Sequence, residues 1–154
     1  QVAKNFGGVP HRAELVRVLD GVSYYNDSIG TSPTRTANGT LQLYDRKIIL
    51  IAGGYDKQIP YDTLGPIIMD KVKTLILMGA TADKIEAAVK AAPNYCEQEI
   101  VILHANSMEK AVALAKEQAQ KGDIVSLSPA SASFDLYPNF EARGNHFKNI
   151  VNAL

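Results

Sequence analysis

The stretch Ile48-Ile49-Leu50-Ile51-Ala52-Gly53-Gly54-Tyr55-Asp56-Lys57 is an apolar run that ends abruptly in glycine and polar residues. Consecutive β-branched and aliphatic residues favour a strand that is covered on both faces, as in a parallel sheet. Two other apolar runs end in the same way, at residues 26–28 and 128–133. In an open parallel sheet, ligands bind beyond the carboxyl ends of the strands. We therefore predict that the three polar clusters face one site.

Other apolar segments complete the sheet. Residues 14–19 and 22–26 are joined by Asp20-Gly21, a dipeptide that suits the type I′ turn of a hairpin at a sheet edge. Four later runs are nearly continuous in β-branched and aliphatic residues and predict parallel, central strands: residues 48–51, 75–78, 100–103 and 124–127.

Apolar residues recur with helical spacing between these strands. Ile85 and Val89 indicate one crossover helix, and Met108 and Val112 indicate another that begins after a Ser107 cap. Two more helices are predicted: residues 33–44, with Pro33 in the first turn, and residues 134–154, with Gly144 as a candidate break. The pattern predicts an α/β fold of three layers, Rossmann-like, with a mostly parallel sheet of about six strands, an antiparallel edge hairpin and helices on both faces.

Length and composition limit the classes of protein that need to be considered. The chain has 154 residues, 46% of them hydrophobic, which suits one domain. Its 16 Lys and Arg balance its 16 Asp and Glu, which argues against a nucleic-acid partner. The single cysteine, Cys96, excludes an internal disulfide, and no apolar run has membrane-spanning length. We expect a cytoplasmic, monomeric protein without a membrane partner, and the start without Met suggests a piece of a longer chain.

The polar clusters contain groups that bind anions. A Gly53-Gly54 step lets backbone approach a ligand, and Lys57 adds a cation close by. Ser133 and Thr31 stand at predicted helix starts, where a hydroxyl and backbone amides suit a carboxylate. Three such groups on one rim suggest a ligand with more than one carboxylate or phosphate.

Each of these groups also has a purely structural interpretation. Gly53-Gly54 serves equally as a tight strand exit, and Lys57 as a solvated lysine. Ser133 and Thr31 are residue types that commonly cap helices, and Asp27 suits the bracing of a turn. No single motif decides between the two interpretations.

Four motifs together resemble the carboxyl-terminal domain of the Mur ligases, and the resemblance covers nearly the whole chain. They are Pro10-His11-Arg12-Ala13-Glu14, Tyr25-Asn26-Asp27-Ser28, the stretch from Ile51 to Lys57, and residues 127–144. Within the last, residues 128–135 and 139–144 are most similar to the members that add D-glutamate. Departures from the family are Ile29, where a lysine is common, and Ser131, where a cysteine is common and the change should matter little.

The resemblance implies an ATP-dependent amide ligase that adds D-glutamate to UDP-N-acetylmuramoyl-L-alanine in peptidoglycan biosynthesis, through an acyl phosphate. By this resemblance, D-glutamate is held by Thr31, Lys57, Ser133 and the backbone around Phe134 and Phe140. The nucleotide is met by Arg12 near its phosphates and by Asp27 near its ribose.

The chain has no Gly-x-x-Gly-Lys-Thr/Ser phosphate loop. In the family, that loop and the ligands of Mg²⁺ belong to a central ATPase domain, and the UDP pocket belongs to an amino-terminal domain. We therefore expect residues 1–154 to be the amino-acid-binding domain alone, with no catalytic residue and no metal site of its own, and inactive in isolation.

Three alternatives remain open from the sequence. One is a relative within the fold, such as folylpolyglutamate synthase or cyanophycin synthetase. A second is a nucleotide-binding Rossmann module, for which the expected Gly-x-Gly-x-x-Gly is missing. A third is a noncatalytic domain that senses a small acid with the same anion-binding groups.

Overall fold

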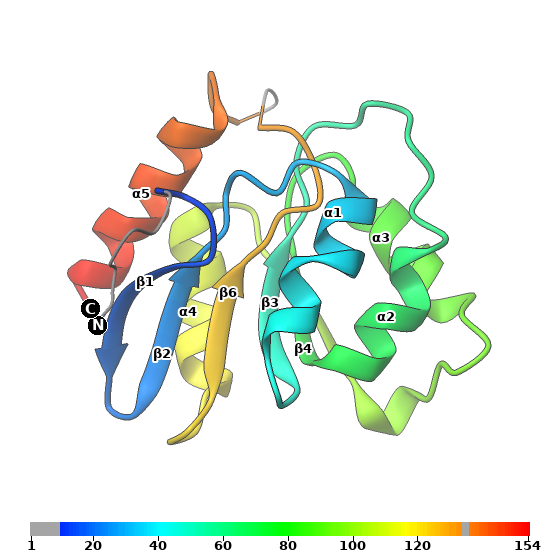
Figure 1. Cartoon of the computed structure of the whole chain (residues 1–154), viewed down its shortest axis with the longest axis horizontal. Helices are drawn as coiled ribbons and strands as arrows, with labels where there is room; N and C mark the ends of the chain where they lie inside the picture. The colour runs from blue at the N-terminus through cyan, green and yellow to red at the C-terminus, as the bar shows by residue number, and fades with distance from the viewer. Residues whose placement is uncertain (1–9, 134–135) are drawn as a thin grey trace.

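The computed structural model describes residues 10–133 and 136–154, which form a six-stranded sheet with helices on both faces (Figure 1). The strands are β1 (Glu14–Leu19), β2 (Val22–Asn26), β3 (Ile48–Ala52), β4 (Val72–Leu77), β5 (Val101–His104) and β6 (Ile124–Leu127). Their order in the sheet is β1-β2-β6-β3-β4-β5. Only β1 and β2 pair antiparallel, and all other neighbouring strands pair parallel. The predicted fold class, including the edge hairpin, is confirmed.

The turn between β1 and β2 has the predicted geometry. Asp20 has a φ of 54° and Gly21 a φ of 79°, and a type I′ turn requires positive φ at both central positions. Leu19 and Val22 are consequently paired directly across the turn.

Two groups of helices cover opposite faces of the sheet. Packed on one face are α1 (Pro33–Asn38), α2 (Leu64–Lys71) and α3 (Ala82–Lys90), and on the other α4 (Met108–Gln118) and α5 (Phe140–Asn152). Short 3₁₀ helices are η1 (Thr40–Leu43) and η2 (Glu97–Glu99). Strand β3 lies between two cores: Leu50 packs into the core beneath α1–α3, and Ile49 and Ile51 pack into the core beneath α4 and α5. This double burial explains the continuous apolar run.

The segment 33–44 is helical, as predicted, but it is divided into two short helices. Helix α1 ends at Asn38, and η1 begins at Thr40 after Gly39. A Cβ added at Gly39 would lie 2.8 Å from the carbonyl oxygen of Arg35, so the chain turns at the residue that has no side chain.

The closing helix also differs from its prediction. It begins at Phe140, not at residue 134, and Asn139 caps it by accepting a hydrogen bond from the Ala142 amide at 2.7 Å. It continues without a break through Gly144. Residues 134 and 135 lie outside the described part of the chain.

Two further expectations need correction. Strand β5 is not central: within the described residues it pairs with β4 alone, and its first residue, Val101, is 44% exposed. Helix α2 was not predicted, because Gly65 and Pro66 in its first turn give a weak helical pattern. Among the described residues, no helix combines the length and the apolar character that crossing a membrane requires.

Candidate functional site

Three loops that follow β2, β6 and β3 lie side by side at one edge of the sheet. We call residues 26–32, 53–58 and 128–133 the rim. The Ala130 amide donates to the carbonyl of Gly30 at 3.1 Å, and the Tyr55 amide donates to the carbonyl of Ala132 at 2.8 Å. Strand β6 lies between β2 and β3, so its loop contacts both of the others. The three polar clusters therefore lie together at one edge of the sheet, as predicted.

Thr31 and Lys57 are two rim residues whose side chains are not fully buried. Thr31 is half-buried and precedes Ser32, whose hydroxyl caps α1 by accepting a hydrogen bond from the Arg35 amide at 3.2 Å. The capping role therefore belongs to Ser32, which leaves the Thr31 side chain to another use. Lys57 is exposed and has no ion pair with any of the residues that the structure describes.

Ser133 is buried, and its carbonyl accepts hydrogen bonds from the amides of Leu136 and Tyr137 at 3.0 and 2.8 Å. It does not cap α5, because Asn139 does so. Phe134, the next predicted ligand residue, lies outside the described residues. Phe140 is the first residue of α5 and is half-buried.

The two residues predicted to meet the nucleotide differ in exposure. Arg12 is exposed, whereas Asp27 is only 2% exposed. One Asp27 oxygen accepts from the Ala13 amide at 3.0 Å, and the other accepts a short hydrogen bond from Thr40 Oγ1. Burial raises the pKa of Asp27, although the bonds from Thr40 and Ala13 and the charges of Arg35 and Arg12 act against this rise. In this structure Asp27 braces the loop after β2, and its contact with a ribose stays a prediction.

Gly53 and Gly54 are surrounded by protein backbone. A Cβ at Gly53 would lie 1.9 Å from the Met78 carbonyl oxygen, and one at Gly54 would lie 2.4 Å from that of Ala132. The structure therefore supports the tight strand exit and not the close approach of a ligand to these two residues. Their function is to let the loops after β4 and β6 pack against β3.

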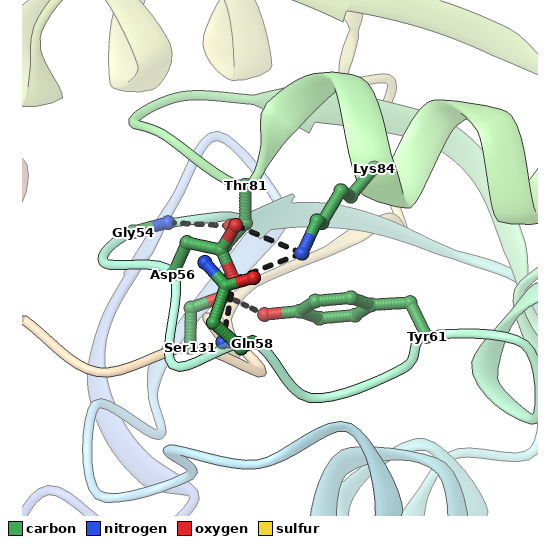
Figure 2. A network of polar contacts seen from close by, with 7 residues as sticks. All are labelled: Gly54, Asp56, Gln58, Tyr61, Thr81, Lys84 and Ser131. Carbon is green, nitrogen blue, oxygen red and sulfur yellow. Dashed lines mark hydrogen bonds and ion pairs between the residues drawn. The ribbon is translucent and has the colours of Figure 1, made fainter.

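A buried polar network lies beneath the Lys57 loop (Figure 2). Thr81 Oγ1 accepts from the Gly54 amide at 3.0 Å and is 2.9 Å from Ser131 Oγ, which is 2.8 Å from the hydroxyl of Tyr61. Thr81 and Tyr61 were not identified from the sequence, since a lone Thr or Tyr gives no local signal. The network ties the loops after β3, β4 and β6 together.

Asp56 is the charged residue of this loop that is already paired. The ammonium group of Lys84 lies 2.9 Å from one Asp56 oxygen, and the Gln58 amide donates to the other at 2.8 Å (Figure 2). The hydrogen bond from Lys84 is the largest of the causes that lower the pKa of Asp56. Asp56 is therefore a poor ligand for a further cation, whereas the neighbouring Lys57 has no ion pair among the described residues.

Arg143 contacts two loops of the rim, and the sequence alone did not point to it. It lies on the first turn of α5, is 3% exposed, and donates three hydrogen bonds to Ser28 and Ser131. The sequence did contain a signal for this role, namely an arginine directly before Gly144 at the start of a helix. A glycine has no Cβ, so the helix can approach another segment closely at that point, and the arginine beside it can reach that segment.

One group of described residues brings metal-ligand types together. Donor atoms of Asp83, Glu86 and His104 lie within 4.8 Å of one another. Both oxygens of Glu86 are already bound, one by His104 Nε2 at 2.7 Å and the other by Lys90 Nζ at 2.9 Å. Glu86 therefore already has a partner on each oxygen, from His104 and from Lys90, and Asp83 lies close to this surface cluster.

The comparisons with known proteins agree with the fold. The family described as Mur ligase, glutamate ligase domain, matches residues 11–131. The chain belongs to the Mur ligase family, and the resemblance noted from its motifs is confirmed.

Two relatives carry the same name, UDP-N-acetylmuramoylalanine–D-glutamate ligase. The chain is 58% identical to the one from Clostridium botulinum (strain Okra / Type B1), over 99% of this chain and 33% of the relative. It is 57% identical to the one from Clostridium acetobutylicum, over 100% of this chain and 33% of the relative. The chain thus spans about a third of the length of the curated relatives it matches.

Solved structures of low sequence identity support the fold alone. A murein peptide ligase from Psychrobacter arcticus 273-4 has a TM-score of 0.60 at 17% identity, covering 97% of this chain and 31% of that one. Folylpolyglutamate synthase from Mycobacterium tuberculosis, complexed with ADP, has a TM-score of 0.59 at 11% identity, covering 93% and 32%.

Proposed function

We propose that this chain is the D-glutamate-binding domain of a longer, ATP-dependent ligase that joins D-glutamate to UDP-N-acetylmuramoyl-L-alanine. The names of the relatives at 57–58% identity support the substrate. The observation that carries the proposal is the pair of backbone bonds from Ala130 to Gly30 and from Tyr55 to Ala132. They bring Thr31, Lys57 and Ser133 to one edge of the sheet, although these residues come from three separate loops.

The rim suits a dicarboxylate. Lys57, which has no ion pair among the described residues, supplies a cation for one carboxylate, and Thr31 supplies a hydroxyl from the neighbouring part of the rim. Ser133 and the amides around Phe134 and Phe140 supply neutral donors for the second carboxylate. A cation and a set of neutral donors at separate points fix both ends of D-glutamate and thereby the direction of its amine.

The chemical step needs little from these residues beyond position. The amine nitrogen attacks the carbonyl carbon of an acyl phosphate, the new C–N bond forms, and the C–O bond to phosphate breaks. Phosphate leaves, and the nitrogen loses a proton to give the amide. Holding the amine against the acyl phosphate supplies rate by removing the entropic cost of bringing the two together.

The nucleotide is held mainly outside this chain. We propose that ATP and Mg²⁺ bind the remainder of the longer protein, and that exposed Arg12 reaches the phosphates and Asp27 the ribose when the parts close together. The chain alone is then inactive, and the complete enzyme is a cytoplasmic monomer.

The test compares two lysine variants in the complete ligase, with release of ADP measured as D-glutamate is varied. Lys57→Met removes the rim cation, and Lys47→Met removes an exposed lysine just before β3, at the opposite end of that strand. We expect the KM for D-glutamate to rise at least about tenfold in the first variant and to stay unchanged in the second. An equal KM for D-glutamate in both variants, or a rate of ADP release that does not depend on the D-glutamate concentration, would contradict the proposal.

A further inference from the structure

We propose that Arg143 is a positioning residue for D-glutamate, which sets the distance between the loops that hold the two ends of the substrate. This inference rests on the proposed function of the rim. It assigns to Arg143 a function in binding although the side chain is buried and acts only through the residues it holds.

The guanidinium group of Arg143 is bonded on three sides. Nε donates to Ser28 Oγ at 2.9 Å, Nη2 donates to the carbonyl of Ser28 at 2.8 Å, and Nη1 donates to the carbonyl of Ser131 at 2.9 Å. One side chain on α5 therefore holds the loop after β2 and the loop after β6 at the same time. The planar fork of arginine fixes both the distance and the angle between these loops.

The residues that Arg143 holds stand next to the predicted D-glutamate contacts. Ser28 precedes Thr31 by three positions, and Ser131 precedes Ser133 by two. Ser28 Oγ also donates to the Phe140 carbonyl at 2.7 Å, which ties the start of α5 to the same group. Three of the five predicted contacts with D-glutamate thus depend on the position of a single guanidinium group.

Fold stability alone is a weak reason for a buried arginine. Removing a guanidinium group from water is unfavourable, and apolar residues of similar volume often stabilise a fold equally well. A charged fork at this place is better explained by the geometry it imposes on two backbone carbonyls. Gly144 contributes to this arrangement, because its missing Cβ lets α5 approach His11 and Asn26 closely enough for Arg143 to reach both loops.

The test determines kcat and the KM for each substrate in the complete ligase, comparing the variants Arg143→Lys and Arg46→Lys with the unchanged enzyme. The second is a matched control, since exposed Arg46 also donates to a backbone carbonyl, that of Gly122, at 2.9 Å. We expect Arg143→Lys to raise the KM for D-glutamate about tenfold, with the KM for ATP and kcat each within about threefold of the unchanged enzyme. Arg46→Lys should change none of the three.

A purely structural role predicts a different result. The active fraction, and with it kcat, would then fall while the KM for D-glutamate stayed unchanged, and this outcome would overturn the inference. If the unmodified ligase shows no D-glutamate dependence, the proposed function itself fails, so the two failures are distinguishable.

A second variant keeps the inference testable if Arg143→Lys does not fold. Ser28→Ala removes the hydroxyl that bridges Arg143 Nε and the Phe140 carbonyl, but it leaves the bonds from Arg143 to the carbonyls of Ser28 and Ser131. We expect a smaller rise, about threefold, in the KM for D-glutamate alone. An unchanged KM in a folded Ser28→Ala enzyme would count against the inference.

Discussion

Gly144 lies so close to His11 that a Cβ at this position would be 2.2 Å from the imidazole Nδ1. His11 cannot easily move away, because it is buried, lies 2.9 Å from the Asn26 side-chain amide and packs edge-on against Phe140. The contact explains why α5 carries a glycine in its first half and still runs unbroken.

We expect Gly144→Ala to destabilise the protein by about 1–2 kcal/mol. Overpacking against His11 costs about 1–3 kcal/mol, and the better helix propensity of alanine offsets up to about 1 kcal/mol of this. The free energy of unfolding in urea gives the result, with exposed Asn145→Ala on the same helix as a control that should be neutral or slightly stabilising. In a His11→Ala background, Gly144→Ala should destabilise the protein less, because the imidazole is gone. If the losses of the two single variants simply add up in the double variant, the contact with His11 is not the cause of the destabilisation.

Gly53 tests the close packing at the exit of β3. It has a φ of 111°, and a Cβ would lie 1.9 Å from the Met78 carbonyl oxygen. Gly122 has a similar φ of 94°, but its nearest neighbouring atom would be 4.0 Å from a Cβ. We expect Gly122→Ala to lose about 1–2 kcal/mol from backbone strain alone and Gly53→Ala to lose at least about 3 kcal/mol. Equal losses in chemical denaturation would show that the steric contact is relieved without cost.

Ser131 tests the network beneath the Lys57 loop. Ser131→Ala leaves Tyr61 and Thr81 without one hydrogen-bond partner each in a buried setting, so we expect a loss of about 1–3 kcal/mol in the free energy of unfolding. Ser131→Cys should lose less, since a thiol still bonds weakly. The double variant Ser131→Ala/Tyr61→Phe should lose less than the sum of the single variants, because one unsatisfied hydroxyl is then absent. Simple addition of the two losses would argue that the hydroxyls are not coupled.

The buried carboxyl group of Asp27 makes stability depend on pH. Its pKa in the folded protein is raised above the usual value of 3.8, mainly by burial. The folded state therefore holds this proton more tightly than the unfolded state, and the contribution of Asp27 to stability decreases as the pH rises from about 3.8 through the raised pKa. Asp27→Asn removes the titrating group, so the free energy of unfolding of the variant should increase relative to that of the unchanged protein as the pH rises through this range. Urea denaturation from pH 4 to pH 7 measures the difference, and a difference that is constant with pH would show that Asp27 does not titrate there.

The strands could be predicted because each carries its signal locally. The residues of β3 are all buried, and they alternate between two cores, which requires an apolar residue at every position. Helices α1 and η1 could not be separated in the same way. Gly39 ends α1 through a close contact with the Arg35 carbonyl, which no pattern of apolar residues reports.

The candidate site was predictable in part. The motifs proposed Thr31, Lys57 and Ser133, and the structure places their loops together, whereas their contact with a ligand stays a prediction. The place of β5 was not predictable, because an apolar run of four residues has the same sequence pattern at the edge as in the centre. Arg143 was missed because its partner Ser28 is 115 positions away.

The sequence by itself determined the alternation of strands and helices, the edge hairpin and the membership of the Mur ligase family, since each depends on residue type at short spacing or on motifs read in order. Only the tertiary structure decided that Gly53 and Gly54 face protein backbone and that Ser32, not Thr31, caps α1. It alone showed that a guanidinium group on the last helix holds two loops of the rim. The physical reason is that steric fit and hydrogen bonding depend on which distant segments meet, and residue types along the chain do not contain that information.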